Sequence, residues 1–425
     1  LTTNGSGTLS WSTVAGGVSS DSNQNTEGGT EALNSNASSY NVAFGYRALY
    51  SNTNGSYNVA FGRRALNSCT DGTQNCALGS DALYSMVGAN NNTAVGTSAL
   101  HGITSGAGNV GVGYIAGYEA HTTTNCVFVG FSAGRRQASG SNNIGIGSYA
   151  LTGAQTSSGD GTGSENTCVG NKCGRHMTSG SNNLFMGSGS GQSCTTGSTN
   201  VAIGYEAMRD ATAPQQCIVI GQQAATGLTT ADKNVILGYA AALGMTSGSN
   251  NICLGYGSGW TISPSGNITT GSHNVVLGDN NIQNLYCADT SISSSDSRDK
   301  TDVTNFTYGL SWINKLNPIT YRWDKRTWYN EYNDDGSIKT EVTPDGSKKR
   351  ARQHIGFLAQ DVLAVEQADG FASKKDDMLV VNLNEDDTGY GLKYERLVPV
   401  LVNAIKELST EVNTLKTKVA ALEAA

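Results

Sequence analysis

A short motif that returns at a fixed interval dominates the first two thirds of the chain. The motif consists of an Asn in most copies, three mostly apolar residues and a Gly, and its Gly positions are 17 apart from 45 to 147 and again from 170 to 255. A longer step, from Gly147 to Gly170, joins the two runs, an equal step leads on to Gly278, and a weaker copy ends at Gly29. Fifteen copies in nearly constant register predict a solenoid in which each copy forms one coil.

The residues inside the motif predict the kind of coil. The positions one and three residues before each Gly are mostly large and apolar, as Val42 and Phe44 are before Gly45. This alternation is typical of a β-strand with one face in a core. The residue between them is also small or apolar (Ala43 in this copy), so both strand faces are expected to be buried. Because one layer of coils is thin, we expect another chain to cover the second face.

The second half of each copy completes the predicted coil. Gly and Asn, which tolerate left-handed backbone conformations, form corner sequences such as those at 141–143 and 180–183. An Ala recurs three residues after the Gly, at Ala48, Ala65, Ala82, Ala99, Ala133, Ala150 and Ala207. The fold class expected for the repeats is therefore mostly β, a trimeric parallel β-roll or solenoid of 17-residue repeats.

Composition divides the chain between Ser294 and Ser295. Residues 1–294 contain 47 of the 54 Gly, all nine Cys and only 22 charged side chains, whereas the much shorter stretch 295–425 contains 39 charged side chains. We expect a connecting segment over 1–24, the repeat domain over 25–294 and a small α+β domain over 295–425. The net charge of −7 argues against nucleic-acid binding, and no apolar run is long enough to span a bilayer, so membrane insertion is not expected.

The end of the chain predicts a coiled coil over 396–425. Apolar residues occupy alternating seam positions of a heptad repeat, which favours association of helices. The seam that we expect to hold a trimer consists of Leu401, Ile405, Leu408, Val412, Leu415, Val419 and Leu422, preceded by Val398. In isolation, Ile or Val at one seam position with Leu at the other tends toward dimers, so the globular part would have to impose a trimer. The alternative is a helix packed in the core of its own chain.

The repeat resembles known surface proteins. The pattern Asn-x-Ala-x-Gly-x-x-Ala, over residues 25–278, is similar to the head repeats of trimeric adhesins and of viral fibre proteins. The resemblance implies a left-handed β-roll in which three chains pack around a common axis.

The region after Ser294 resembles the intramolecular chaperone domain at the end of phage tail fibres and spikes, the self-cleaving peptidase S74 family. The matching pieces are Ser-Asp-x-Arg-x-Lys at 295–300, Leu-x-Pro-x-x-Tyr-x-Trp at 316–323, His-x-Gly-Phe-x-Ala-Gln-Asp-Val at 354–362 and a segment over 393–408. The resemblance implies a domain that trimerises, guides folding and then cuts itself off. It implies Ser294 and Ser295 as the cleavage site, Ser295 as the nucleophile, Lys300 as the general base and His354 in a supporting role, with no cofactor and no metal.

The spacing of Ser295 and Lys300 places a condition on this chemistry. Five residues apart on a regular helix, two side chains point about 140° away from each other. The pair can meet only if a turn intervenes or if neighbouring chains shape the site. A Lys also serves as a base only where burial lowers its pKa toward neutrality. We therefore expect cleavage to depend on assembly of the trimer.

These observations favour the distal part of a homotrimeric viral tail fibre or spike that attaches the virion to a host cell. The expected partners are a host cell-surface receptor, most simply a glycan, and other virion tail proteins, with the chaperone domain released. One alternative is a glycan depolymerase, which requires two suitably spaced carboxylates; Asp279 and Asp289 are the best pair. Another is a cellular trimeric adhesin, in which a membrane anchor is expected after the coiled coil.

Two further groups in the repeats have two interpretations each. Cys168, Cys173 and His176 could surround a metal ion, but both Cys occupy repeat positions usually held by Ala, which favours packing. The Cys count is odd and lacks CxxC pairs, so neither a disulfide scaffold nor a zinc module is expected. Exposed aromatic positions could stack on sugars or pack at corners; they are Tyr46, Tyr114, Tyr205 and Tyr239.

Overall fold

The computed structural model describes residues 2–3, 9–10, 18–153, 161–285, 295–332, 338–340, 342–384, 387 and 389–424. The chain divides into two compact units. The first unit contains Leu1–Trp260 and Thr269–Leu277, and the second contains Thr261–Ile268 and Gly278–Ala425. The second unit thus begins upstream of the compositional boundary at Ser295, because residues 278–285 pack with it.

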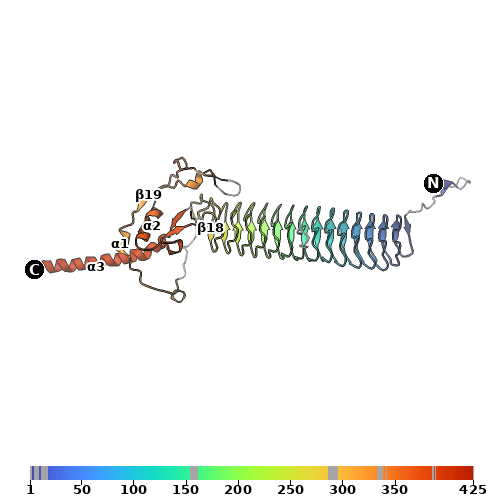
Figure 1. The fold of residues 1–425 in the computed structure, drawn as a ribbon, viewed down its shortest axis with the longest axis horizontal. Helices are drawn as coiled ribbons and strands as arrows, with labels where there is room; N and C mark the ends of the chain where they lie inside the picture. The colour runs from blue at the N-terminus through green and yellow to red at the C-terminus, as the bar shows by residue number, and fades with distance from the viewer. Residues whose placement is uncertain are drawn as a thin grey trace. The chain divides into compact units, whose positions relative to one another are not determined.

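A sheet of 16 strands forms the first unit, with one short strand in each coil (Figure 1). Strands β4 to β18 are parallel, and β3 is added antiparallel at the end. Most partners lie one repeat apart, as Val42 and Val59 do, and the longer step occurs where Ile144 meets Thr167. The predicted repeat, strand position and register are confirmed.

The strands are short and end one residue before each repeat Gly. Outside the sheet, β1 (Thr2–Thr3) pairs with β2 (Leu9–Ser10). The strands of the sheet are β3 (Ser19–Ser20), β4 (Thr26–Gly28), β5 (Val42–Phe44), β6 (Val59–Phe61), β7 (Cys76–Leu78), β8 (Thr93–Val95), β9 (Val110–Val112), β10 (Val127–Val129), β11 (Ile144–Ile146), β12 (Thr167–Val169), β13 (Leu184–Met186), β14 (Val201–Ile203), β15 (Ile218–Ile220), β16 (Val235–Leu237), β17 (Ile252–Leu254) and β18 (Val275–Leu277).

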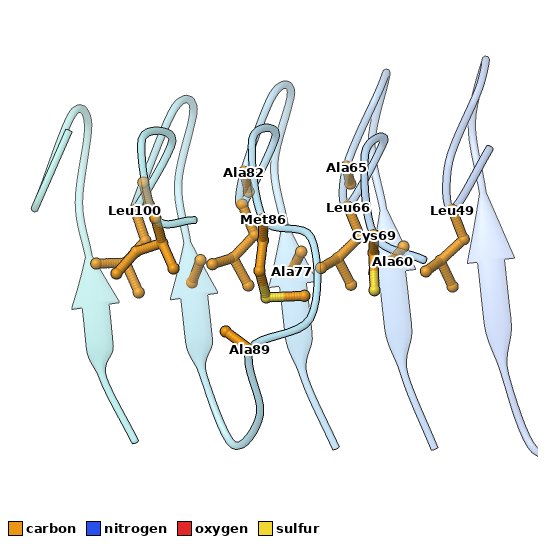
Figure 2. Close-up of a cluster of buried hydrophobic side chains, with 14 of the residues drawn as sticks. Leu49, Ala60, Ala65, Leu66, Cys69, Ala77, Ala82, Met86, Ala89 and Leu100 are labelled. Carbon is orange, nitrogen blue, oxygen red and sulfur yellow. The ribbon is translucent and has the colours of Figure 1, made fainter. Parts of the chain in front are cut away.

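In strands β5 to β18 the middle residue is buried in the interior of the roll. Ala60 and Ala77 are fully buried, and so are Leu66 and Leu83 on the turns opposite them. Figure 2 shows Leu66 in a row with Leu49 and Leu100 of other coils, and Ala60 and Ala77 on the strands that they face. The predicted Ala positions after the Gly are fully buried as well, at Ala48, Ala65, Ala82, Ala99, Ala133, Ala150 and Ala207. The core is narrow: Ala60 and Ala77 face Leu on the turns, whereas the larger Phe128 and Phe185 at the same strand position are buried against Gly134 and Gly191.

The outer face of the sheet carries the larger apolar residues. The positions one and three before each Gly stay partly exposed along the whole sheet: Leu78 is 50% exposed and Ile146 is 39% exposed. The expectation that both strand faces are buried is therefore met within one chain only by the middle residues. We call the outer row the strand-face stripe; its most exposed members are Val59, Phe61, Leu78, Ile146, Met186, Ile218, Ile220, Ile252, Val275 and Leu277.

The corners depend on left-handed backbone at residues of many types. Asn142 and Asn182 adopt φ of 56° and 59°, as the Asn-rich corners predict, but Tyr57 and Lys233 adopt φ of 62° and 58° at the same repeat position. Such conformations cost about 1–2 kcal/mol for a residue with a Cβ. Hydrogen bonds between neighbouring coils hold the corners in place, for example from the Tyr57 amide to the Ser39 carbonyl at 3.4 Å.

The second unit is a small α+β domain that ends in a long helix. Its helices are α1 (Leu310–Ile313), α2 (Ala359–Ala368) and α3 (Leu397–Glu423), with 3-10 turns η1 (Ser297–Asp299), η2 (Arg326–Trp328), η3 (Lys375–Asp377) and η4 (Tyr394–Arg396). Three antiparallel pairs are β19 (Ile319–Tyr321) with β22 (His354–Gly356), β20 (Glu331–Tyr332) with β21 (Ile338–Thr340), and β23 (Val381–Leu383) with β24 (Tyr390–Leu392).

The core of this domain surrounds Trp312 and the first turn of α3. Trp312, Val362, Val380 and Leu397 are buried there. Glu366 is also fully buried, and its carboxylate accepts hydrogen bonds from the backbone amides of residues 379, 380 and 381 at 3.0, 2.6 and 3.0 Å. A buried carboxylate is tolerated because three donors replace its water shell. None of the helices in the described ranges is long and apolar enough to cross a membrane.

Candidate functional site

Ser295 and Lys300 lie in hydrogen-bond contact. The Nζ atom of Lys300 donates to the Oγ atom of Ser295 at 2.7 Å. The 3-10 turn η1 between them supplies the bend that the five-residue spacing requires. Ser294, the residue on the other side of the expected cleavage site, lies outside the described residues. The structure thus brings together the expected nucleophile and the expected base.

The turn between the two residues has its own cap. The side chain of Asp296 accepts from the backbone amide of Arg298 at 2.9 Å and pairs with the Arg298 guanidinium at 2.6 Å. The Arg298 hydrogen bonds lower the pKa of Asp296. The amide of Lys300 then donates to the Ser297 carbonyl, which closes the turn at 3.4 Å. The motif Ser-Asp-x-Arg-x-Lys therefore encodes a capped turn between the expected nucleophile and the expected base, a role for Asp296 and Arg298 that the sequence did not predict.

The side chains of Ser295 and Lys300 are solvent exposed in the single chain. An ammonium group at Lys300 donates to Ser295 Oγ in this contact, whereas a neutral amine at the same 2.7 Å could accept from the Ser295 hydroxyl. To act as a base, the ammonium group must lose a proton, which requires surroundings that exclude water. The described residues of one chain do not provide such surroundings at Lys300.

His354 lies on β22, opposite Tyr321 on β19. Its ring stacks on Tyr321 with centroids 5.5 Å apart and meets the edge of Trp323 at 6.3 Å. No hydrogen bond joins the described side chain of His354 to Ser295 or Lys300. The structure places His354 in an aromatic cluster with Tyr321 and Trp323.

The seam of the C-terminal helix faces solvent. Within α3 the buried residues are Leu397, Val400 and Ala404, all in the first turns of the helix. Every predicted seam residue from Leu401 onward is exposed, and Leu415 is 59% exposed. This exposure rules out the alternative in which the seam packs in the core of its own chain.

The three residues considered for a metal site divide between core and surface. Cys168 and Cys173 are fully buried within the roll, as the packing interpretation predicts, while His176 lies partly exposed outside. Burial raises the pKa of the Cys168 thiol, and the neighbouring Cys173 adds to the rise. A protonated thiol is a poor metal ligand. No cluster of three or more His, Cys, Asp or Glu side chains that could hold a metal occurs in the described ranges.

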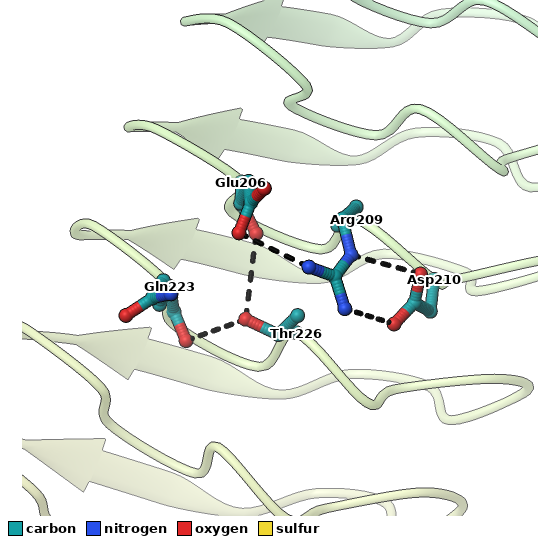
Figure 3. A network of polar contacts seen from close by, with 5 residues as sticks. All are labelled: Glu206, Arg209, Asp210, Gln223 and Thr226. Atoms are coloured by element: carbon teal, nitrogen blue, oxygen red, sulfur yellow. Dashed lines mark hydrogen bonds and ion pairs between the residues drawn. The ribbon is translucent and has the colours of Figure 1, made fainter. Parts of the chain in front are cut away.

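Ion pairs engage carboxylates of the roll in structural roles. Figure 3 shows Arg209 bridging Glu206 at 3.1 Å and Asp210 at 2.8 Å, with Thr226 of the next coil donating to the Gln223 carbonyl. The Asp210 hydrogen bond is the main reason that the pKa of Arg209 is raised. A carboxylate held in an ion pair is poorly placed to act as a glycosidase acid.

Of the two carboxylates considered for a depolymerase, Asp279 is among the described residues. Asp279 caps the turn after β18, accepting from the Asn281 amide at 2.9 Å and side chain at 2.7 Å. Asp289 lies outside the described residues, so the separation of the two carboxylates is not defined.

Aromatic side chains form rows on the surface of the roll. The four Tyr residues singled out in the sequence are exposed, and two have a ring on the next coil: Tyr114 stacks on Phe131 at 5.7 Å and Tyr239 on Tyr256 at 5.6 Å. A row that the sequence reasoning missed joins Tyr84, His101 and Tyr118 at 5.1 and 4.8 Å. These three residues are one repeat apart in the sequence, and this spacing could have predicted that their rings stack.

Comparison with known proteins gives one family match for the C-terminal domain. Residues 295–371 match the model of the family described as chaperone of endosialidase, peptidase S74. The match starts at Ser295 and includes Lys300 and His354. No curated protein and no solved structure matches the chain. The family implies a self-cleaving intramolecular chaperone, and its combination with a β-solenoid fits a protein of the tail-spike or fibre type.

Proposed function

Since residues 295–371 carry a chaperone-of-endosialidase domain, we propose that the chain is the distal part of a homotrimeric viral tail fibre or spike. Its roll attaches the virion to a host cell, and its C-terminal domain drives trimerisation and folding, then cleaves the bond between Ser294 and Ser295. The observation that carries this proposal is the 2.7 Å contact between Lys300 and Ser295.

The cleavage step uses the two groups in contact. Neutral Lys300 takes the proton from Ser295 Oγ as this atom attacks the carbonyl carbon of Ser294. The C–N bond breaks, the proton passes to the departing nitrogen of Ser295, and an ester remains between Ser294 and the Ser295 side chain. Water hydrolyses the ester, which leaves a carboxylate on Ser294 and a free amine on Ser295. An exposed Lys300 is a poor base for the first step, so assembly that buries it would start the reaction.

Two exposed apolar surfaces support a trimer. The strand-face stripe runs along the whole sheet, and the seam of α3 continues for more than three heptads. Continuous apolar surfaces of this length are unusual on a monomer and typical of sites where chains associate. Three copies packed through both surfaces would remove them from water.

A glycan receptor is supported by the aromatic rows. Tyr114 with Phe131, and Tyr239 with Tyr256, present apolar ring surfaces and hydroxyl groups together, which suits a sugar ring. Binding of fluorescent host-surface polysaccharide tests this role: Tyr114→Ala should weaken binding, whereas Thr97→Ala, at the same repeat position one coil earlier, should not.

The decisive experiment on cleavage is a denaturing gel of the full chain and three variants. Wild type should give two fragments, and Ser295→Ala only one band, while the neighbouring Ser297→Ala should still cleave. Lys300→Arg keeps a positive donor beside Ser295 but cannot give up its proton, so it should not cleave. Cleavage in Ser295→Ala, or none in wild type, would disprove the proposed reaction.

The role of His354 can be separated from its packing. His354→Phe retains a flat ring against Tyr321 while removing the imidazole. If the imidazole supports cleavage, this variant should form trimers but cleave more slowly than wild type. Cleavage at the wild-type rate would limit His354 to packing.

A further inference from the structure

The chain just after the last strand of the roll is bound by the C-terminal domain. Asn280 is the centre of this contact: Lys325 Nζ donates to both its backbone carbonyl and its Oδ1 atom, each at 3.2 Å. The Asn280 side-chain amide donates to Thr327 Oγ1 at 3.1 Å. Arg350 Nη2 donates to Asn281 Oδ1 at 3.3 Å. We call this set of contacts the Asn280 clasp.

The surface that receives Asn280 is held in place by aromatic rings. Lys325 lies over Trp323 at 5.1 Å and over Trp328 at 5.9 Å, and Arg350 lies over Trp328 at 4.7 Å. The Arg350 amide donates to the Trp323 carbonyl at 2.9 Å, which fixes the two cation-bearing segments side by side. Cations stacked on Trp are restrained before they bind, so less conformational entropy is lost when they form hydrogen bonds with Asn280 and Asn281.

The segment is also fixed on its own side. Asp279 caps the turn that contains Asn281, and the Asn280 amide donates to the Ile262 carbonyl at 2.8 Å. Ile282 and His354 line the cavity of about 100 Å³ that remains beside the clasp. Asn280 is therefore presented in one defined conformation to Lys325 and Thr327.

The position of the clasp relative to the expected cleavage site is decisive. Asn280 and Asn281 precede Ser294, whereas Lys325, Thr327 and Arg350 follow Ser295. None of the clasp contacts involves Ser294, Ser295 or Lys300. Hydrolysis of the bond between Ser294 and Ser295 consequently turns an intrachain contact into one between two fragments without removing any of its hydrogen bonds.

We infer that the Asn280 clasp keeps the C-terminal domain bound to the roll after the chain is cut, so that cleavage and release are separate steps. The occupant of the surface around Lys325 and Arg350 is the segment 279–283 of the same chain. This inference rests on the proposed self-cleavage for its timing, but the clasp itself does not depend on which groups perform that cleavage.

The test separates cleavage from retention. A denaturing gel of the full chain scores cleavage, and native size-exclusion chromatography in low salt scores whether the two fragments elute together. We expect co-elution for wild type and separate elution for cleaved Asn280→Ala and Arg350→Gln. Lys339→Met is the matched control, because this exposed Lys on the neighbouring hairpin pairs only weakly with Glu331, at 3.8 Å, and should not affect co-elution.

Each outcome decides the inference. Separate elution of the wild-type fragments, or co-elution of the cleaved Asn280→Ala fragments, would overturn it. If the wild-type chain does not cut itself, the proposed function fails, but retention of the fragments by the clasp can still be measured. A recognition sequence for a specific protease placed within residues 286–294 then allows the chain to be cut on demand, with the same expected pattern of elution.

Discussion

The Oδ1 atom of Asn75 accepts two hydrogen bonds from Asn92, the residue one coil further along the roll: one from its backbone amide at 2.9 Å and one from its side chain at 3.3 Å. Asn92 repeats the arrangement toward Asn109, with distances of 3.0 Å for both bonds. Each side chain in this ladder also donates to a carbonyl of the following corner, as Asn92 does to Gly106 at 3.0 Å. The Asn at the start of the motif thus ties strand, corner and neighbouring coil together inside the core.

Replacing a rung of this ladder should destabilise the roll. Asn92→Ala leaves the buried amide of Asn109 and the carbonyl of Gly106 without their partners. Each unsatisfied buried group costs about 1–3 kcal/mol, so the free energy of unfolding should fall by roughly 2–6 kcal/mol. Guanidinium unfolding of the full chain, followed by circular dichroism of the sheet, measures the change.

The ladder is interrupted at two positions, where restoring Asn should have the opposite effect on stability. Cys126 and Cys217 replace Asn, and their thiols make longer contacts: Cys126 Sγ lies 3.4 Å from the Gly140 carbonyl and 3.4 Å from the Asn143 amide. Cys126→Asn restores the missing rung and should stabilise the roll by about 1 kcal/mol. A loss of stability in this variant would show that the neighbouring coils have adapted to sulfur.

The repeat could be predicted from sequence because its spacing and alternation depend on local patterns. The assignment of faces could not, since Ala43 and its apolar neighbours Val42 and Phe44 fit either side of a strand. Only the narrow distance between strand and turn places Ala inside. The left-handed conformation at Tyr57 and Lys233 was also beyond reach, because the hydrogen bonds that impose it come from residues in the neighbouring coils.

The repeat Gly at the end of each strand should not tolerate a side chain. Gly62 adopts φ of 137°, and a Cβ there would lie 2.4 Å from the Gly79 carbonyl oxygen. The next coil is backbone and cannot move aside without breaking the register. Gly62→Ala should therefore lower the free energy of unfolding by about 3 kcal/mol or more. Thermal unfolding monitored by circular dichroism measures this loss.

Gly227 offers a control for this change. It lies at a repeat position that carries Ser51, Ser68 and Ser85 in other coils, and no strained φ applies to it. Gly227→Ser should change the midpoint of unfolding far less than Gly62→Ala does. Equal effects of both substitutions would mean that the coils are not stacked as closely as the Gly62 contact requires.

The buried thiols should make the roll sensitive to alkali. Burial raises the pKa from 9.0 to about 11 at Cys69 and Cys253 and to about 12 at Cys194. The folded thiols stay protonated where the unfolded ones ionise, so this contribution to stability is complete below pH 9 and is lost as pH rises toward 11 and 12. The slope is about 1.4 kcal/mol per pH unit for each thiol.

Denaturant titrations between pH 8 and 11 measure this slope. Cys253→Ala should reduce the slope with pH. Ala already occupies this strand position in other coils, as Ala43 and Ala60 do. Native alkylation at pH 8 gives an independent reading, because Cys69, Cys194 and Cys253 should stay unmodified until denaturant is added. Rapid native labelling of these three thiols would contradict their burial.

The site could be predicted from sequence less completely than the fold. The contact between Ser295 and Lys300 could be anticipated because their motif is compact and one turn can bridge five residues. The Asn280 clasp was not found, since Asn280 and Lys325 are far apart in the sequence and neither belongs to a recognisable motif. His354 shows the opposite limit: its motif was recognised, but its stacking on Tyr321 depends on the pairing of β19 with β22.

The exposed seam of α3 allows the proposed dependence of cleavage on assembly to be tested. Leu408→Asn with Leu415→Asn places two amides in the apolar seam and should prevent association of the helices, because each amide would be buried without partners. If burial of Lys300 requires the helices to associate, this double variant should form fewer trimers and cleave at least tenfold more slowly than wild type, although the strand-face stripe is unchanged. Multi-angle light scattering gives the mass and a timed denaturing gel gives the rate. Glu411→Gln with Lys418→Gln, off the seam on the same helix, should leave both unchanged. Cleavage by the monomer at the wild-type rate would show that Lys300 becomes a base without help from neighbouring chains.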